Sequence, residues 1–164
     1  INNLYMKSVS VVFLQAVIVL IGIVAMAILL YFPTTEGRAA NLDLISIYAD
    51  PLILYVYVAS IAFFVALYQA FKLLGYIGQN KVFSPKSVDA LKCIKYRAIV
   101  LSILIVMAGL FIRLFHDKED DPAGFLALCI VTTFASIVVA TAAAVFEKLL
   151  QNATDMKSEN DLTI

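Results

Sequence analysis

Long uncharged apolar stretches constrain the fold of this chain more than any other feature. Three of them contain no Lys, Arg, Asp or Glu: Ser8 to Phe32, Pro51 to Phe71 and Pro122 to Phe146. A helix needs about 20 apolar residues to cross roughly 30 Å of hydrocarbon, so each stretch is long enough to span a membrane. The first is longer than the roughly 7–15 apolar residues of a signal peptide, so we expect a retained helix.

A fourth, shorter stretch lies between Arg97 and Arg113. Its 15 uncharged residues would form only about 22 Å of helix. The long side chains of the two arginines can lie along hydrocarbon while their charged ends reach the headgroups. We therefore expect a full crossing over residues 96–115, with Arg97 and Arg113 as interface anchors. The alternative is a re-entrant segment.

These stretches predict an all-α integral membrane protein: a four-transmembrane-helix bundle with an amphipathic cytoplasmic extension of the third helix. The composition agrees, because 63% of the residues are hydrophobic and 15% are charged, against about 45–50% and about 25% in soluble domains. We expect a single membrane domain over residues 1–164. Its parts are crossings at about 8–32, 51–73, 96–115 and 122–147, a cytoplasmic connection at 74–95 and a cytoplasmic tail at 148–164.

Basic residues are distributed unevenly between the two sides of the predicted membrane. With both termini in the cytoplasm, nine of the twelve Lys and Arg residues lie on the cytoplasmic side. The positive-inside rule therefore predicts that both termini are cytoplasmic. In the first outer loop, Leu42, Ile45 and Tyr48 have helical spacing, which predicts a short helix on the membrane surface.

The connection between the second and third crossings has the clearest local pattern. Phe83-Ser84-Pro85 resembles the start of a helix, with Ser84 as a cap, Pro85 in the first turn and Phe83 packing against Val88. Gly75 and Gly78 before it indicate a helix end and a turn. The helix from Pro85 has an apolar side with Val88, Leu91, Cys93 and Ile94, and a polar side with Lys86, Asp89, Lys92 and Lys95. We expect the basic side to contact anionic lipid; the alternative is a docking surface for a cytoplasmic partner.

Small and polar residues within the crossings indicate how the helices pack. Membrane helices approach closely through small side chains, and such residues recur at every fourth position. They are Ala62, Ala66 and Ala70 in the second crossing, and Thr132, Ser136, Ala140 and Ala144 in the fourth. They predict a compact bundle, with a substrate path or a homodimer contact as the alternatives. Gln15 lies two turns inside the first crossing, so we expect its amide to form a hydrogen bond to another helix.

Residues suited to chemistry are few. The centres of the crossings contain no charged residue, which argues against coupled ion transport. Candidate metal ligands are His116, Asp117, Asp120 and Asp121, but their spacing matches no calcium loop, so a solvated loop is favoured. Cys93 and Cys129 lie in separate segments and indicate isolated thiols. We expect no catalytic residue, no cofactor, no bound metal and no direct contact with nucleic acid.

Two segments resemble a known bacterial family. Val82-Phe83-Ser84-Pro85-Lys86-Ser87-Val88, followed by Ala90-Leu91 and Ile94, is similar to the family "domain of unknown function 2975", as is the ending from Glu159 to Ile164. The resemblance implies a multi-pass protein of the bacterial cytoplasmic membrane. It also implies association with a small helix-turn-helix regulator of the Cro/cI type, because members are often encoded beside one. It supplies no catalytic residues.

The sequence thus favours a non-enzymatic regulatory or signalling membrane protein that binds a cytoplasmic helix-turn-helix regulator. The alternative is a small transporter or a protein that protects the membrane against toxic compounds. Besides the lipid bilayer, candidate partners are the regulator and a second copy of the chain. The residues expected to contact lipid or a partner are Phe83, Ser84, Pro85, Lys86, Lys92, Lys95, Asp161, Leu162, Thr163 and Ile164.

Overall fold

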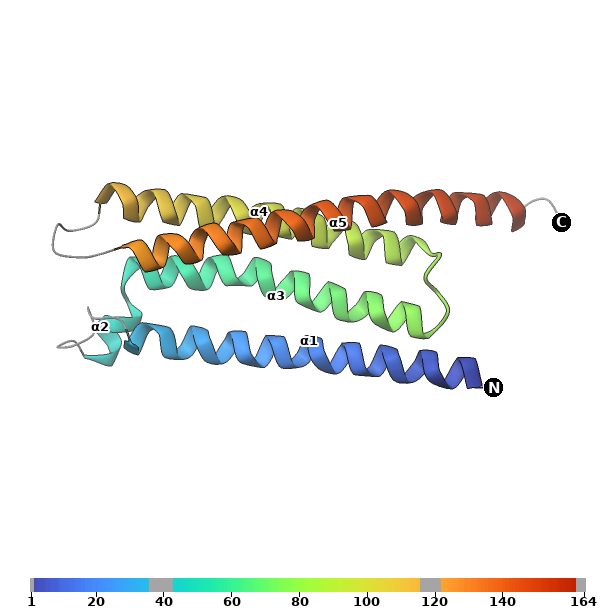
Figure 1. Cartoon of the computed structure of the whole chain (residues 1–164), viewed down its shortest axis with the longest axis horizontal. Helices are drawn as coiled ribbons and strands as arrows, with labels where there is room; N and C mark the ends of the chain where they lie inside the picture. The colour runs from blue at the N-terminus through green and yellow to red at the C-terminus, as the bar shows by residue number, and fades with distance from the viewer. Residues whose placement is uncertain (1, 36–42, 116–121, 162–164) are drawn as a thin grey trace.

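The computed structural model describes residues 2–35, 43–115 and 122–161, and the side chains of residues 9–34, 43–115 and 122–160. Over these residues the chain is helical, with short turns between the helices (Figure 1). The helices are α1 (Asn2–Thr35), α2 (Leu44–Tyr48), α3 (Pro51–Gly78), α4 (Pro85–Phe115) and α5 (Ala123–Asp161). Both chain ends and the turn between α3 and α4 lie at one end of the bundle, here called the terminal end. The opposite end carries α2 and is called the α2 end.

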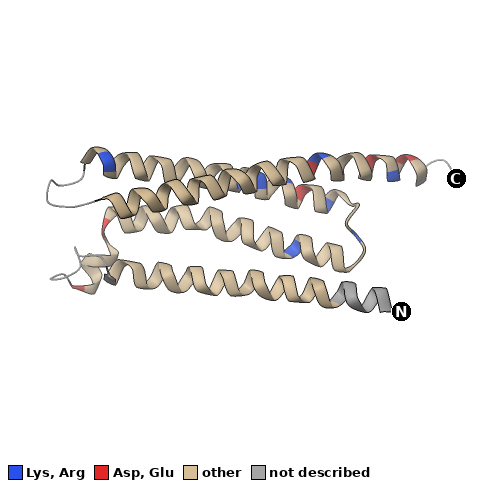
Figure 2. Cartoon of the chain, in the orientation of Figure 1, with Lys and Arg blue, Asp and Glu red and all other residues tan. Residues whose placement is uncertain are grey.

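Four of the helices are long and apolar enough to cross a membrane. Their membrane-length segments are Val9–Thr34, Pro51–Gly78, Pro85–Phe115 and Ala123–Asn160. Charged residues lie at the α2 end and in the part of the bundle nearer the terminal end, and the stretch of each long helix between them is uncharged (Figure 2). The predicted all-α fold with four transmembrane-length helices is therefore confirmed. The third of them, α4, is one continuous helix of 31 residues rather than a segment that breaks and returns.

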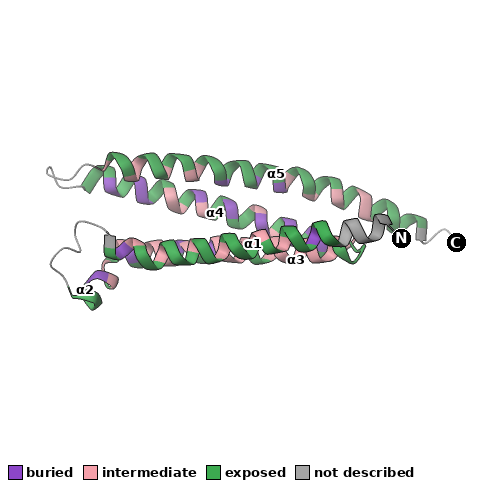
Figure 3. Cartoon of the chain, turned by 60° about the horizontal axis from the view of Figure 1, so that its bottom comes forward, coloured by how far each residue is buried: buried purple, intermediate pink, exposed green. Residues whose placement is uncertain are grey.

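The four long helices pack in the order α1, α3, α4, α5, and Figure 3 shows α4 between α5 and the other two. The α4–α5 contact is the most extensive, α3 packs along α4, and α1 packs along α3. Among the described residues, α1 and α5 make no extended contact with each other. We expected a compact bundle, but the arrangement is open along one side. Figure 3 shows the consequence: buried positions concentrate on the inner helices, and α1 and α5 are largely exposed.

Small and polar residues hold α1 against α3. A Cβ atom added at Gly22 would lie 3.2 Å from Cδ2 of Leu67, so the two helices approach closely at this glycine. The Gln15 side-chain amide donates a hydrogen bond of 3.2 Å to the backbone carbonyl of Phe71. The predicted bond from Gln15 to another helix is thus confirmed.

The last turn of α1 contains Pro33, and the helix continues two residues beyond it. Proline has no N–H group, so the carbonyl of Leu29, four residues earlier, loses its usual helical partner. The hydroxyl of Tyr57 on α3 donates a hydrogen bond of 3.0 Å to this carbonyl. A contact from a second helix therefore satisfies the oxygen that Pro33 leaves without a helical donor.

Our interpretation of Gly75 and Gly78 as a helix end and a turn was only partly right. Gly75 lies inside α3, and Gly78 is its last residue. The left-handed residue that ends the helix is Asn80, with φ of 56°. The backbone N–H groups of Asn80 and Lys81 bond to the carbonyls of Ile77 (3.2 Å) and Tyr76 (2.8 Å). This is the Schellman pattern, in which asparagine can replace glycine because its side chain tolerates the left-handed conformation.

A regular seam on α5 faces α4. Its buried and half-buried residues alternate three and four positions apart, as in a left-handed pair of packed helices. They are Ser136, Ala140, Ala143, Glu147, Leu150 and Thr154. On α4, a Cβ atom added at Gly109 would lie 3.5 Å from Cβ of Cys129, so the helices also approach closely near the α2 end. Because the seam continues past Glu147, the first part of the predicted tail at 148–164 is a packed helix.

Candidate functional site

The turn from Gln79 to Ser84 is fixed onto the start of α4 by two serine hydroxyls. Ser84 and Ser87 both donate hydrogen bonds to the carbonyl of Lys81, at 2.7 and 3.1 Å, and the two hydroxyl oxygens lie 3.2 Å apart. Ser87 is fully buried. We predicted that the Ser84 side chain caps α4. Instead, the hydroxyl of Ser84 donates back to Lys81. The Ser84 carbonyl accepts hydrogen bonds from the N–H groups of Ser87 and Val88 in the first turn of the helix. Pro85 is the first residue of α4, as predicted.

The first three turns of α4 separate polar from apolar side chains as the sequence indicates. Lys86, Asp89 and Lys92 are exposed. On the other side, Val88, Leu91 and Ile94 are buried within the protein. The apolar side is therefore covered by neighbouring helices, and only the polar side is available to lipid or to a partner. Phe83 keeps about half of its surface exposed, and its packing against Val88 stays a prediction.

Lys95 differs from the other lysines of this segment. Its ammonium group lies 2.5 Å from the carboxylate of Glu147 on α5, and both side chains are about four-fifths buried. The same ammonium group lies 4.7 Å from the centre of the Tyr96 ring. We predicted Lys95 as part of the exposed basic side, but the structure places it in an ion pair between α4 and α5.

The continuation of α5 beyond Glu147 carries exposed apolar side chains that we did not predict as site residues. Leu149 is 59% exposed and Met156 is 64% exposed. They are seven positions apart and so share one face of the helix. The seven-residue spacing of these two apolar side chains could have indicated an apolar face of the helix. The signal was weak because most of the residues around them are polar.

Several predicted residues have no described side chain. Asp161 is the last residue of α5, and its side chain is not described; Leu162, Thr163 and Ile164 lie outside the described residues. The candidate metal ligands His116, Asp117, Asp120 and Asp121 also lie outside them. Across the described part of the chain, no three His, Cys, Asp or Glu residues are grouped so that they could hold a metal ion.

The two predicted interface anchors lie on α4, and both are exposed. Arg97 and Arg113 are 16 residues apart, which corresponds to about 24 Å along the helix. They flank the uncharged part of α4, residues 98–112, and their role as interface anchors stays a prediction.

Comparison with known proteins gives a family but no described activity. Residues 34–164 match the model of a family described as "Protein of unknown function (DUF2975)". The chain is also similar to the "Uncharacterized membrane protein YoaS" of Bacillus subtilis (strain 168). The two are 45% identical over 161 residues, which cover 97% of this chain and 100% of the relative. No solved structure matches the chain.

Proposed function

Because the chain belongs to the DUF2975 family of proteins of unknown function and is a multi-pass membrane protein, we propose that it is a non-enzymatic regulatory protein that holds a cytoplasmic regulator. In this proposal the terminal end of the bundle faces the cytoplasm of a bacterial cell. The regulator binds the first turns of α4 and the last turns of α5. We call these residues, 85–95 and 148–161, the terminal helix pair.

The observation that carries the proposal is the continuity of α4 and α5. Each runs without a break from a membrane-length apolar segment into the terminal helix pair. A continuous helix is stiff over this length, so a displacement of the apolar segments also moves the terminal helix pair. The Lys95–Glu147 ion pair joins the two helices where they leave the uncharged region. This arrangement suits a protein that transmits a change in the membrane to a bound partner.

The chemistry of the terminal helix pair suits a protein partner. Leu149 and Met156 are exposed in a part of α5 that, with the span ending near residue 147, lies outside the hydrocarbon. Exposed apolar side chains in water are typical of protein contact sites when polar groups surround them. Lys148, Asp155 and Lys157, which are next to them in the sequence of α5, are exposed as well. The resemblance to a family whose genes lie beside Cro/cI-type regulators favours such a regulator as the partner.

The test measures binding of the purified neighbouring helix-turn-helix regulator to the full chain in lipid nanodiscs. We expect saturable binding that falls at least tenfold in a Leu149→Glu, Met156→Glu variant. A matched control, Gln151→Glu, adds a carboxylate between the two positions in the sequence but on a different face of α5, and should retain binding. Deletion of residues 161–164 tests the predicted contribution of the chain end.

Two results would contradict the proposal. One is no binding of the regulator to the intact chain, together with unchanged output of the regulator's target promoter when the membrane protein is removed. The other is equal binding by the unaltered chain and the double variant. Flux of a solute through liposomes in place of regulator binding would favour the transporter alternative.

A further inference from the structure

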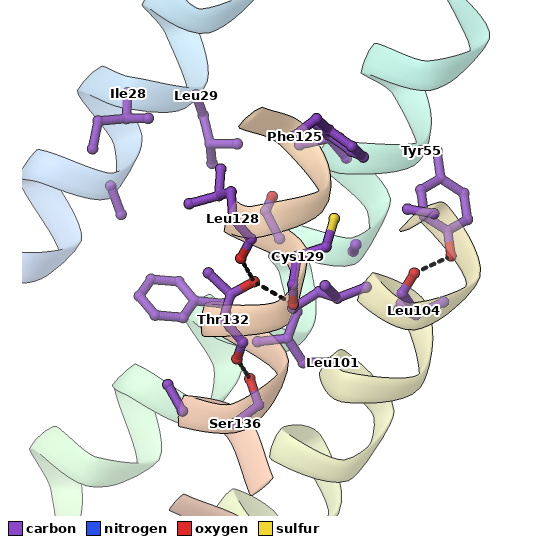
Figure 4. Close-up of a pocket in the computed structure, with 18 residues that line it drawn as sticks. Ile28, Leu29, Tyr55, Leu101, Leu104, Phe125, Leu128, Cys129, Thr132 and Ser136 are labelled. Atoms are coloured by element: carbon purple, nitrogen blue, oxygen red, sulfur yellow. Dashed lines mark hydrogen bonds between the residues drawn. The ribbon is translucent and has the colours of Figure 1, made fainter. Parts of the chain in front are cut away.

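The open side of the bundle contains a cavity of about 450 Å³ in the half nearer the α2 end. All four long helices contribute to its lining: Ala25 and Leu29 on α1, Phe63 on α3, Leu101 on α4, and Phe125 and Ala135 on α5. Figure 4 shows these walls, with Leu29, Leu101 and Phe125 among the labelled side chains. The cavity opens sideways, because α1 and α5, the two outer helices, make no extended contact over the described residues.

The hydroxyl groups that line the cavity already form hydrogen bonds within the protein. Tyr55 donates a hydrogen bond of 2.7 Å to the carbonyl of Leu104 on α4, and Ser60 donates one of 2.7 Å within α3. On α5, the hydroxyl groups of Thr132 and Ser136 donate to carbonyls of their own helix, at 2.7 and 2.9 Å (Figure 4). A polar ligand or a water cluster would find few partners here, since buried water needs two to four polar contacts. The occupant is therefore apolar.

The size of the cavity decides between apolar occupants. A membrane-crossing helix about 10 Å wide and 30 Å long fills roughly 2,400 Å³, about five times the volume of the cavity. A helix from a second copy of the chain therefore cannot enter it. The volume lies within the roughly 300–1,000 Å³ of small-ligand sites. A flexible hydrocarbon chain that enters from the side fits both this volume and the apolar walls.

We propose that this cavity binds one acyl chain of a membrane phospholipid, with the headgroup remaining outside the bundle near the α2 end. The membrane-length segments surround the cavity, so lipid is the medium at its opening. The site makes the bundle responsive to the lipid that occupies it, because the four helices that form the walls include both α4 and α5. This inference does not depend on the regulator, and either can fail without the other.

The test uses native mass spectrometry of the full chain in mild detergent, titrated with dioleoylphosphatidylglycerol. Ala135 lines the cavity and is exposed, so Ala135→Phe should fill the space without disturbing the core. Ala142 is also exposed and lies on the same face two turns away, outside the lining; Ala142→Phe is the matched control. Ala25→Phe fills the cavity from α1. If Ala135→Phe does not fold, the lipid binding of Ala25→Phe tests the proposal instead.

We expect one saturable lipid adduct on the unaltered chain and on Ala142→Phe. Both filling variants should weaken that adduct at least tenfold. The proposal is overturned by the absence of a saturable adduct, or by equal lipid binding in the unaltered chain and a folded filling variant. A third result would also overturn it: the unaltered chain is a dimer, and a filling variant becomes a monomer without losing bound lipid. In that case a second copy of the chain, and not lipid, would occupy the opening.

Discussion

The hydroxyl of Tyr57 on α3 donates a 3.0 Å hydrogen bond to the carbonyl of Leu29 on α1, which Pro33 deprives of its helical N–H donor. The bond joins two helices that are otherwise held by small residues and by Gln15. It also explains how α1 continues past a proline to Thr35. In lipid, where no water can replace a missing donor, such a carbonyl requires a partner from the protein.

This relationship predicts that the importance of Tyr57 depends on Pro33. Tyr57→Phe should lower the free energy of unfolding by about 0.5–1.5 kcal/mol, as expected for the loss of one hydrogen bond. In a Pro33→Ala background, residue 33 regains an N–H group that can serve the Leu29 carbonyl. The cost of Tyr57→Phe should then fall to less than half.

Equilibrium unfolding in detergent micelles with increasing SDS measures these costs. Tyr68→Phe is the control, because Tyr68 is exposed and its ring stays beside Lys72 when the hydroxyl is removed; it should change stability little. An equal cost of Tyr57→Phe with and without Pro33 would show that the carbonyl does not depend on the tyrosine.

The close approach of α4 and α5 predicts a size limit at Gly109. An alanine Cβ would lie in ordinary contact with Cys129, at 3.5 Å, so Gly109→Ala should be tolerated. The branched side chain of Gly109→Val has no such space and should cost about 1–3 kcal/mol through overpacking.

At Gly124 an added Cβ atom would have no neighbour within 4 Å, so Gly124→Val serves as the control for the same substitution in open space. The midpoint of thermal unfolding in detergent compares the three variants. A Gly109→Val protein as stable as Gly124→Val would contradict the α4–α5 packing.

The ion pair between Lys95 and Glu147 predicts coupling between α4 and α5. Because both side chains are about four-fifths buried, removing one partner leaves a poorly solvated charge. Lys95→Met and Glu147→Gln should each destabilise the protein. The double variant should cost less than the two single costs combined, with a coupling energy of about 0.5–3 kcal/mol.

The same double-mutant cycle on the exposed Gln151–Asp155 contact, a 2.9 Å hydrogen bond one turn apart on α5, supplies the comparison. We expect its coupling to be near the few tenths of a kcal/mol typical of exposed helical pairs. Additive costs at Lys95 and Glu147 would mean that the charges do not interact.

The sequence predicts the helical architecture well because hydropathy and length depend only on neighbouring residues. The four transmembrane-length helices, the start of α4 at Pro85 and the polarity of its first turns were all visible in this way. The bond from Gln15 was predictable as well, since an amide at membrane depth requires a partner. Only its acceptor, the Phe71 carbonyl, needed the structure.

Features that depend on distant residues were not predictable. Lys95 appeared as one of several lysines on a polar side, and its pairing depends on Glu147, 52 positions later. The left-handed residue at the end of α3 is Asn80, although the sequence indicated a glycine at the helix end. The cavity on the open side exists because α1 and α5 stay apart. No short sequence pattern indicates that two helices do not contact each other.

The most direct test of the account is the side of the membrane on which the terminal end lies. In a chain with Cys93→Ala and Cys129→Ala, single cysteines replace Lys81 in the α3–α4 turn and Ile45 on α2, both of which are exposed. Intact cells are then treated with a membrane-impermeant maleimide. We predict labelling of Ile45→Cys in intact cells, and of Lys81→Cys only after the membrane is opened. Labelling of Lys81→Cys in intact cells would place the terminal helix pair outside the cytoplasm and contradict regulator binding.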